Sequence, residues 1–279
     1  MITNVSELLK DAYENNYAVG AFNVYNYETI KAVVEVVKER KQPAIIAFGE
    51  KYLENMELKE VVNLIRTMTT NITSKIAIHL DHCKDLNIIK KAIDAGFTSV
   101  MYDGSFLPFE ENVENTKLVV KMAHEVGVSV EAELGSLKLG DHSNEDEATE
   151  IYTDPKQAEE FVSRTGVDCL AVSIGTVHGM YKGEPKISVE RLIEINEKAH
   201  IPLVLHGGSG TPVETIKKCI KNGVTKINVN TEISYNVVES FKKELTGKTH
   251  FSQLSVLAVL KAKEVVDKYM EIFNPQKEY

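Results

Sequence analysis

Short apolar segments rich in β-branched residues alternate with longer segments of helical periodicity through most of this 279-residue chain. The predicted strands cover 18–22, 44–48, 76–80, 99–102, 129–134, 169–173, 203–205 and 226–229. The helices predicted between them cover 28–38, 57–70, 86–95, 112–126, 155–164, 189–198 and 212–222. This order favours the α/β class and a closed parallel (β/α)₈ barrel, with an open doubly wound sheet as the alternative.

Two further helical patterns lie outside the alternation. A leading helix over 5–15 is expected to cover one end of the barrel, and a trailing helix over 252–272 follows the polar segment 246–250. No segment rich in Pro, Gly or Ser separates these parts, and no internal repeat is visible. We therefore predict one domain over 1–279, in which 250–279 forms a C-terminal helical extension.

The composition of the chain limits which partners and which cellular compartment can be expected. A net charge of −9 disfavours nucleic acid and anionic membranes as main partners. Cys83, Cys169 and Cys219 are widely spaced, which argues against both a disulfide framework and a zinc knuckle. The chain shows neither a signal peptide nor an apolar run of about 20 residues. We expect a reduced, cytoplasmic protein that binds neither nucleic acid nor membrane.

Residues that carry chemistry collect where the predicted strands end. They are His79, Asp81, His82, Asp103, Glu131, Glu133, His178, His206, Asn228 and Asn230. In a barrel, the carboxyl ends of the strands and the loops that follow them form the active site. These side chains are therefore predicted to share one rim.

Three histidines, His82, His178 and His206, lie at predicted strand ends or in the loops that leave them. Three histidines around one open position form a catalytic zinc site, although position alone leaves structural roles open. His79 alternates with Asp81 along its strand, so a hydrogen-bonded core role is favoured for His79.

The acidic residues of the rim allow several roles. Asp81 can act as a general acid/base beside a metal, or as a carboxylate that orients a histidine. Asp103 and Glu133 can be alternative ligands, a second metal site or hydrogen-bond anchors, of which anchoring is favoured.

The segment Gly207-Gly208-Ser209-Gly210 predicts a phosphate cradle, because backbone amides before a helix attract anions. A tight strand-to-helix turn is the alternative. Thr211 and Glu214 have the spacing of a capping box at the start of that helix. Lys182 could add a charge to the same phosphate, or could be a solvated surface lysine.

Taken together, these residues resemble the class II, metal-dependent ketose-bisphosphate aldolases. The matching stretches are AVGAFNVYN (18–26), AIHLDH (77–82), AGFTSVMYDGSFLPFEENV (95–113), VSVEAELG (128–135), AVSIGTVHGMYKGEP (171–185), PLVLHGGSG (202–210) and KINVNTE (226–232). The resemblance covers most of the chain, and the barrel is the fold that it implies.

The resemblance also implies roles. His82, His178 and His206 would bind Zn²⁺, and Asp81 would exchange the proton of the C4 hydroxyl. Substrate binding would use Asn23, Gly179, Lys182, Gly207, Gly208, Ser209, Asn228, Asn230 and Thr231. Asp103 and Glu133 match positions that can hold a second or displaced metal ion. A monovalent cation, Na⁺ or K⁺, and a homodimer or homotetramer are usual in the family.

The chain departs from the family pattern in the loop whose acid helps proton exchange in relatives, and again where the second phosphate would be recognised. The loop after the fifth strand lacks the common GGxED sequence, so no loop acid can be assigned in 136–150. The second strand leads into Phe48-Gly49-Glu50-Lys51 in place of Ser or Thr, and arginines are few. Asn230 favours fructose 1,6-bisphosphate, cleaved to the triose phosphates dihydroxyacetone phosphate and glyceraldehyde 3-phosphate, over tagatose 1,6-bisphosphate.

Two other functions remain open at this point. Lys226, on the last predicted strand, is the candidate for a Schiff-base aldolase. A barrel that binds sugar phosphates without turnover, as the accessory subunit of an aldolase, is the non-enzymatic alternative.

Overall fold

The computed structural model describes residues 1–145 and 149–275. Its strands are β1 (Ile2–Thr3), β2 (Val19–Asn23), β3 (Ala44–Gly49), β4 (Ile76–Cys83), β5 (Ser99–Tyr102), β6 (Ser129–Leu134), β7 (Lys138–Leu139), β8 (Cys169–Val172), β9 (Val177–His178), β10 (Leu203–Leu205) and β11 (Val224–Val229). Its α-helices are α1 (Val5–Asn15), α2 (Tyr27–Arg40), α3 (Leu58–Met68), α4 (Leu86–Ala95), α5 (Phe109–His124), α6 (Pro155–Thr165), α7 (Val189–Ala199), α8 (Val213–Lys221), α9 (Thr231–Glu244) and α10 (Phe251–Phe273). A short 3₁₀ helix, η1 (Glu50–Tyr52), follows β3.

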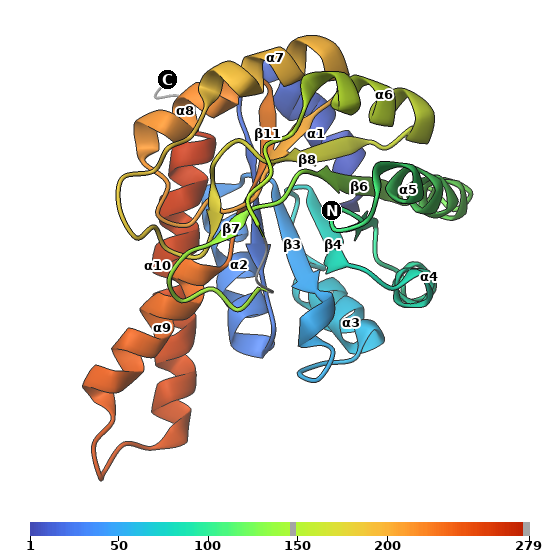
Figure 1. Cartoon of the computed structure of the whole chain (residues 1–279). Helices are drawn as coiled ribbons and strands as arrows, with labels where there is room; N and C mark the ends of the chain where they lie inside the picture. The colour runs from blue at the N-terminus through green and yellow to red at the C-terminus, as the bar shows by residue number, and fades with distance from the viewer. Residues whose placement is uncertain (146–148, 276–279) are drawn as a thin grey trace.

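Eight parallel strands close into a barrel surrounded by helices (Figure 1). Around the barrel the order is β2, β3, β4, β5, β6, β8, β10 and β11, and β11 pairs with β2 to complete the circle. The predicted (β/α)₈ fold is therefore confirmed, and the open sheet is excluded. The carboxyl ends of these strands all lie at one end of the barrel.

The predicted element bounds agree with the structure to within a few residues. The helix predicted over 112–126 is in fact Phe109–His124, so it begins and ends earlier. Three very short strands, β1, β7 and β9, and the helix α9 had no predicted range. The short strands carry too few residues for any periodicity to be visible.

Helix α1 covers the amino-terminal end of the barrel, as predicted. Its buried face (Val5, Leu8, Leu9 and Ala12) packs with inward-facing apolar side chains of the strands, including Val19 and Ile45. Burial of such side chains stabilises a fold by about 25 cal/mol per Å² of apolar area. The barrel is thus closed by apolar packing at one end, and polar side chains fill its other end.

The trailing helix α10 packs against α2 and runs beside α9, so that the two helices project from the barrel as an arm (Figure 1). At its end, the carbonyl of Phe273 accepts a 3.0 Å hydrogen bond from the amide of Ala18. Within the extension predicted over 250–279, Phe251–Phe273 is helical, and residues 276–279 lie outside the described ones.

Two smaller expectations had different outcomes. The capping box at Thr211 and Glu214 is wrong, because Pro212 is the N-cap of α8 and provides no side-chain cap. The Thr211 hydroxyl instead donates to the carbonyl of Gly207, at 3.0 Å. The three cysteines are buried and unpaired, as expected. Among the described residues, no helix combines the length and apolar character needed to cross a membrane.

Candidate active site

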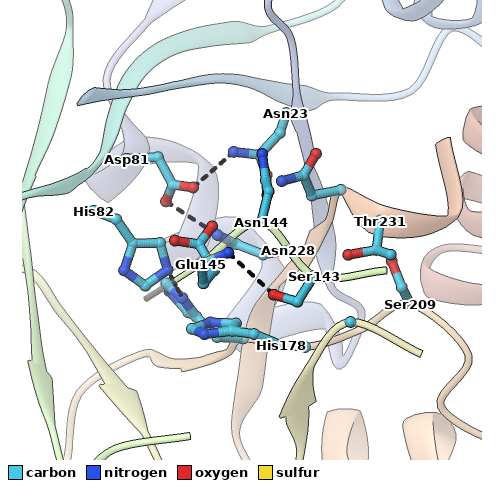
Figure 2. A pocket seen from close by; sticks show the side chains of 14 residues that line it. Asn23, Asp81, His82, Ser143, Asn144, Glu145, His178, Ser209, Asn228 and Thr231 are labelled. Carbon is cyan, nitrogen blue, oxygen red and sulfur yellow. Dashed lines mark hydrogen bonds between the residues drawn. The ribbon is translucent and has the colours of Figure 1, made fainter. Parts of the chain in front are cut away.

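Two neighbouring cavities open at the carboxyl ends of the strands. The smaller one is lined by the predicted histidines and by the segment 143–145 (Figure 2). The larger one has a volume of about 910 Å³ and extends past β3, η1 and the start of α5. Both cavities are lined by Asn23, Asp81, His82 and His178. These shared residues therefore form the junction of one elongated site.

His82 reaches the junction through an irregular backbone. The pairing of β4 with β5 shifts register between Leu80 and Cys83, and His82 has a φ of 46°. Regular alternation would point His82 away from the barrel interior once Asp81 points into it. A bulge with a left-handed residue costs conformational energy, and such strain is found mostly at functional sites.

The rings of His82, His178 and His206 converge. Each offers a nitrogen, and these nitrogens lie within 4.8 Å of one another. His206 Nδ1 and His82 Nε2 are 2.7 Å apart, and His178 Nε2 is buried without a hydrogen-bond partner. Burial and the nearby charge of His82 hold the pKa of His178 well below its usual value. A neutral imidazole of this kind is ready to bind a metal.

The outward nitrogens of two of these rings rest on carboxylates. His82 Nδ1 lies 3.0 Å from Asp103 Oδ2, and His206 Nε2 lies 2.9 Å from Glu131 Oε1. A carboxylate on the far nitrogen orients a metal-binding histidine and raises its basicity. The donor set, the orphaned His178 nitrogen and these two carboxylates therefore fit a zinc ion with three histidine ligands.

Glu133 and Asp103 form a second group of donors with His82, whose ligand atoms also lie within 4.8 Å of one another. Burial and the nearby charge of Asp103 raise the pKa of Glu133 well above its usual value, and Glu133 Oε2 has no hydrogen-bond partner. Asp103 is anchored to the rim, because it accepts hydrogen bonds from the amide and hydroxyl of Ser105. Both an anchoring role and a second metal site are compatible with this geometry.

Asp81 is held between two amides at the junction. Its Oδ2 accepts a 2.8 Å hydrogen bond from Asn23 Nδ2, and its Oδ1 accepts one of 3.1 Å from Asn228 Nδ2 (Figure 2). Burial opposes its ionisation, but the charges of His82 and Lys226 outweigh burial and lower the pKa of Asp81. Asp81 is therefore an oriented carboxylate, available as a base.

Beneath the histidines lies a buried ion pair. Lys226 Nζ is 2.8 Å from Glu131 Oε2 and 3.1 Å from Glu131 Oε1, and both side chains are fully buried. Burial opposes the ionisation of Glu131, but Lys226 and His206 hold its pKa at about 2. Lys226 is thus committed to Glu131. His79 lies beside this pair and contacts Ser99 Oγ at 2.9 Å, as expected for a hydrogen-bonded core histidine.

The predicted phosphate cradle lies on the other side of the histidines. Gly207, Ser209, Asn230 and Thr231 line the smaller pocket together with Gly179. Helix α9 begins there. Its N-cap residue Asn230 makes no capping hydrogen bond, and the Ser209 hydroxyl accepts a 3.1 Å hydrogen bond from the amide of Glu232 in the first turn. Backbone amides at such a helix start favour an anion. Gly208 lies beneath, where its amide donates to the carbonyl of Asn228 at 3.0 Å, so it shapes the cradle rather than lining it.

The structure does not bring Lys182 to the cradle. Its side chain is 69% exposed, and its ammonium group lies 3.1 Å from Asp141 Oδ1. Lys182 lines neither of the two cavities. Its geometry is that of the surface lysine that the sequence left as the alternative.

Sequence reasoning missed three residues beside the junction: Lys51, Tyr52 and Glu145. The Tyr52 hydroxyl accepts hydrogen bonds from Asn144 Nδ2 at 3.1 Å and from Asn230 Nδ2 at 2.9 Å. Lys51 forms an ion pair with Glu145, which lines both cavities. The acidic pair Glu145-Asp146 was the sign available in the sequence of a loop acid. Because the chain lacks the glycines of the family loop, neither residue could be assigned to the family position. Asp146 lies outside the described residues.

Short strand pairings bring the segment that contains Glu145 to the site. β7 pairs with β9, so that Leu139 lies opposite His178. Antiparallel bridges join Ser136 to Ile151 and Asp141 to Met180. These pairings hold the loop after β6 against the loop that carries His178. They thereby place Glu145 at the site.

Comparisons with known proteins all point to one family. A family model described as "Fructose-bisphosphate aldolase class-II" matches residues 3–278. A fructose-bisphosphate aldolase of Geobacillus stearothermophilus is 48% identical over 234 residues, which are 83% of this chain and 81% of that protein. A probable fructose-bisphosphate aldolase of Bacillus subtilis is 44% identical, over 88% of this chain and 87% of the relative. The crystal structure of the YdjI aldolase from Escherichia coli K12 superposes with a TM-score of 0.89 at 34% identity, covering 99% of both chains.

Proposed function

This chain belongs to the class-II fructose-bisphosphate aldolase family, and on that premise we propose that it cleaves fructose 1,6-bisphosphate reversibly to dihydroxyacetone phosphate and glyceraldehyde 3-phosphate. It is an aldehyde-lyase of a family that depends on zinc. The observation that carries the proposal is an oriented carboxylate, Asp81, beside three convergent histidines and a phosphate cradle. A cytoplasmic, glycolytic role accords with this chemistry.

His82, His178 and His206 would hold the zinc ion, with Asp103 and Glu131 orienting two of the rings. When bound, zinc supplies a Lewis acid that polarises the ketone of the substrate and stabilises developing negative charge. Asp103 and Glu133 are proposed as a second donor group beside His82. The monovalent cation stays a prediction.

The cradle would bind the phosphate of the dihydroxyacetone half. Gly179, Gly207, Ser209, Asn230 and Thr231 surround the small pocket, and the start of α9 adds its dipole. We propose Gly208 as a support of this cradle, and leave Lys182 out of it because of its exposure. The phosphate then fixes the reacting carbons beside Asp81.

Asp81 would act as the base for cleavage. It takes the proton of the C4 hydroxyl while the C3–C4 bond breaks, so that C4 becomes the aldehyde carbon. The electron pair of the broken bond remains on the dihydroxyacetone half as an enediolate. Asn23 and Asn228 hold the carboxylate in place, and the unpartnered Oδ1 of Asn228 is available to accept a hydrogen bond from a substrate hydroxyl. Such a positioned base contributes about 10²–10⁴-fold to a rate.

Glu145 in its protonated form is proposed to deliver a proton to C3 of the enediolate. Asp81 then passes the proton taken from the C4 hydroxyl to water, and Glu145 regains a proton from water, so that the cycle closes. Glu145 belongs to the loop after β6 and lines both cavities together with Asp81 and His82. Protonation there completes dihydroxyacetone phosphate. In the reverse direction, the same group removes that proton before the aldehyde is attacked.

The two competing functions find less support. A Schiff-base lysine must be uncharged to attack a ketone, whereas the ammonium of Lys226 is fully buried against both oxygens of Glu131. A non-catalytic binding subunit has no need of Asp81 and its two amides. The enzymatic proposal accounts for both arrangements.

We also propose that the arm formed by α9 and α10 contacts a second copy in a homodimer or homotetramer. Large apolar side chains are exposed along it, among them Leu245, Phe251 (78% exposed), Val256 and Leu260. The chain itself is proposed to fold as one domain, because α10 packs on α2 and reaches Ala18. Light scattering of a Phe251→Asp variant tests the first proposal, and a single cooperative unfolding transition tests the second.

The experiment that tests the function is a coupled assay of triose phosphate release with the purified protein. Fructose 1,6-bisphosphate and tagatose 1,6-bisphosphate are compared side by side, and an Asp81→Asn variant serves as the inactive control. The proposal expects turnover of both or of the fructose epimer alone, with a higher kcat/KM for fructose. Faster cleavage of tagatose 1,6-bisphosphate would assign the alternative sugar, and release of no triose phosphate from either would refute the aldolase function.

A further inference from the structure

The elongated site has one half without an assigned anion receptor. If the cradle binds the phosphate at C1, the chain of the substrate passes Asp81 and enters the larger cavity, which shares Asp81 and His82 with the pocket. The distal phosphate then lies in the larger cavity. This step rests on the proposed function.

The larger cavity offers few positive charges. The carboxyl side chains that line it are those of Glu50, Asp81, Asp103, Glu133 and Glu145. The basic side chains are Lys51 and Lys84, and no arginine lines it among the described residues. A phosphate in such surroundings is repelled unless an ammonium group faces it. The receptor is therefore one of these two lysines.

Depth distinguishes the two lysines. Lys84 Nζ lies 5.4 Å from the centre of the Phe106 ring, and Phe106 is 61% exposed, so this ammonium is at the outer edge. The Lys51 side chain is only 28% exposed. Lys51 lies two residues after Gly49, which ends β3 and lines the cavity without a side chain. Lys51 is thus nearer to the junction, because its partner Glu145 lines both cavities.

Lys51 at present holds the segment that carries Glu145. Its ammonium forms an ion pair with Glu145 and donates to the carbonyl of Asn144 at 3.1 Å and to Asn144 Oδ1 at 3.3 Å. The pair is partly exposed, with side-chain exposures of 28% and 20%, so solvent weakens it. A phosphate of nearly two negative charges binds an ammonium group more strongly than one carboxylate does.

We propose that Lys51 is the receptor of the distal phosphate, and that the phosphate binds it in exchange for Glu145. The exchange leaves Glu145 free to reach the reacting carbons at the moment when a bisphosphate is bound. Lys51 is thus a specificity-determining residue for ketose bisphosphates over ketose 1-phosphates. It also makes the proton donor available only when the correct substrate is present.

The test compares kcat/KM for fructose 1,6-bisphosphate and fructose 1-phosphate, which lacks the distal phosphate. Lys51→Met is expected to lose about 10- to 100-fold with the bisphosphate, the scale of one hydrogen-bonded charge. With the monophosphate kcat/KM should not fall, because the substitution also releases Glu145 from its ion pair. Lys51→Arg should retain most of the preference. Lys90→Met is the matched control, because Lys90 pairs with Asp94 on the exposed face of α4.

Several outcomes overturn the proposal. Equal losses on both substrates would make Lys51 a structural pin for the loop. A loss of preference in Lys84→Met but not in Lys51→Met would assign Lys84 instead. A wild-type enzyme that cleaves both substrates equally well would show that no receptor exists. Failure of the proposed function itself looks different, since the wild type would then cleave neither substrate.

A second variant tests the exchange. In Glu145→Gln, Lys51 has lost its competing carboxylate, so KM for the bisphosphate should fall about 2- to 5-fold, the scale of a partly exposed ion pair, while kcat also falls. KM for fructose 1-phosphate should not fall. An unchanged or higher KM for the bisphosphate would contradict the exchange.

Discussion

The two halves of the site differ in how they would recognise a phosphate. At the cradle, the backbone turns of β10 and the start of α9 do so, and glycines make close approach possible. A Cβ atom on Gly207, whose φ is +72°, would lie 2.2 Å from the carbonyl oxygen of Val177. In the larger cavity, a single lysine side chain on η1 would do so while paired with a loop carboxylate. Backbone recognition is rigid, whereas side-chain recognition can be coupled to another event.

A substitution at the junction should reduce the cleavage of substrates with one phosphate and with two phosphates equally. Asp81→Ala removes the base that both share, so kcat should fall about 10²–10⁴-fold for fructose 1,6-bisphosphate and fructose 1-phosphate. Steady-state kinetics with both substrates measure this, and an unchanged thermal midpoint excludes unfolding. A loss below tenfold would remove Asp81 from the reaction.

A substitution in the backbone of the cradle should impair both substrates to the same extent. In Gly208→Ala, the new Cβ would lie 2.6 Å from the carbonyl oxygen of Asn228 and must displace it. A shift of about 1 Å near the reacting atoms costs about 10²-fold, and both substrates should lose kcat/KM equally. Gly183→Ala is the control, because a Cβ there meets no atom within 4 Å. A loss of kcat/KM for fructose 1,6-bisphosphate alone would mean that Gly208 acts on the distal phosphate and not at the cradle.

The ion pair below the junction should act on the metal alone. Lys226→Met leaves Glu131 without its counter-charge, and Glu131 orients His206. Zinc affinity should fall about 10- to 100-fold, measured by competition with a chromogenic chelator. The double variant Lys226→Met/Glu131→Gln avoids an unpaired buried charge and separates affinity from folding. Unchanged affinity in both variants would make the pair purely structural.

His79 should affect stability without favouring either half. Burial and the charge of Lys226 lower its pKa to about 4, from 6.5 in the unfolded chain. The unfolded state therefore binds a proton first, and the stability contribution is complete above pH 6.5 and is lost as pH falls from 6.5 to 4. At pH 5 the loss is about 2 kcal/mol. Denaturant unfolding at pH 7.5 and 5.0 should show a smaller loss in His79→Asn; an equal loss would contradict this assignment.

The fold, and the glycine-rich turn at which the cradle is proposed, could be predicted because their causes are local. The strands Ser99–Tyr102 and Ser129–Leu134 and the helix Val5–Asn15 have the predicted bounds, since apolar periodicity and end signals agree there. Glycines before a helix predicted the cradle for the same reason. Helix α9, whose start lies at the proposed cradle, went without a predicted range. Of its residues only Thr231 and Ile233 are buried, so it presents no broad apolar face to the core.

The distal half was not predictable, because it depends on tertiary placement. Lys51 and Glu145 are far apart in sequence, and tertiary pairings such as β7 with β9 and Asp141 with Met180 bring the loop after β6 to the site. Lys182 shows the opposite error, since proximity in sequence to His178 does not bring its side chain to the cradle. The inward position of His82 required a backbone bulge that alternation alone does not indicate.

The most direct test of the account is removal and return of the metal. The protein is treated exhaustively with a chelator, dialysed free of it, and titrated with Zn²⁺ while fructose 1,6-bisphosphate cleavage and bound metal are both measured. The account predicts that cleavage is lost, that it returns as zinc binds to the site of His82, His178 and His206, and that a His206→Ala variant regains neither zinc nor activity. Full activity in demonstrably metal-free protein, or a borohydride-trapped adduct on Lys226, would contradict it.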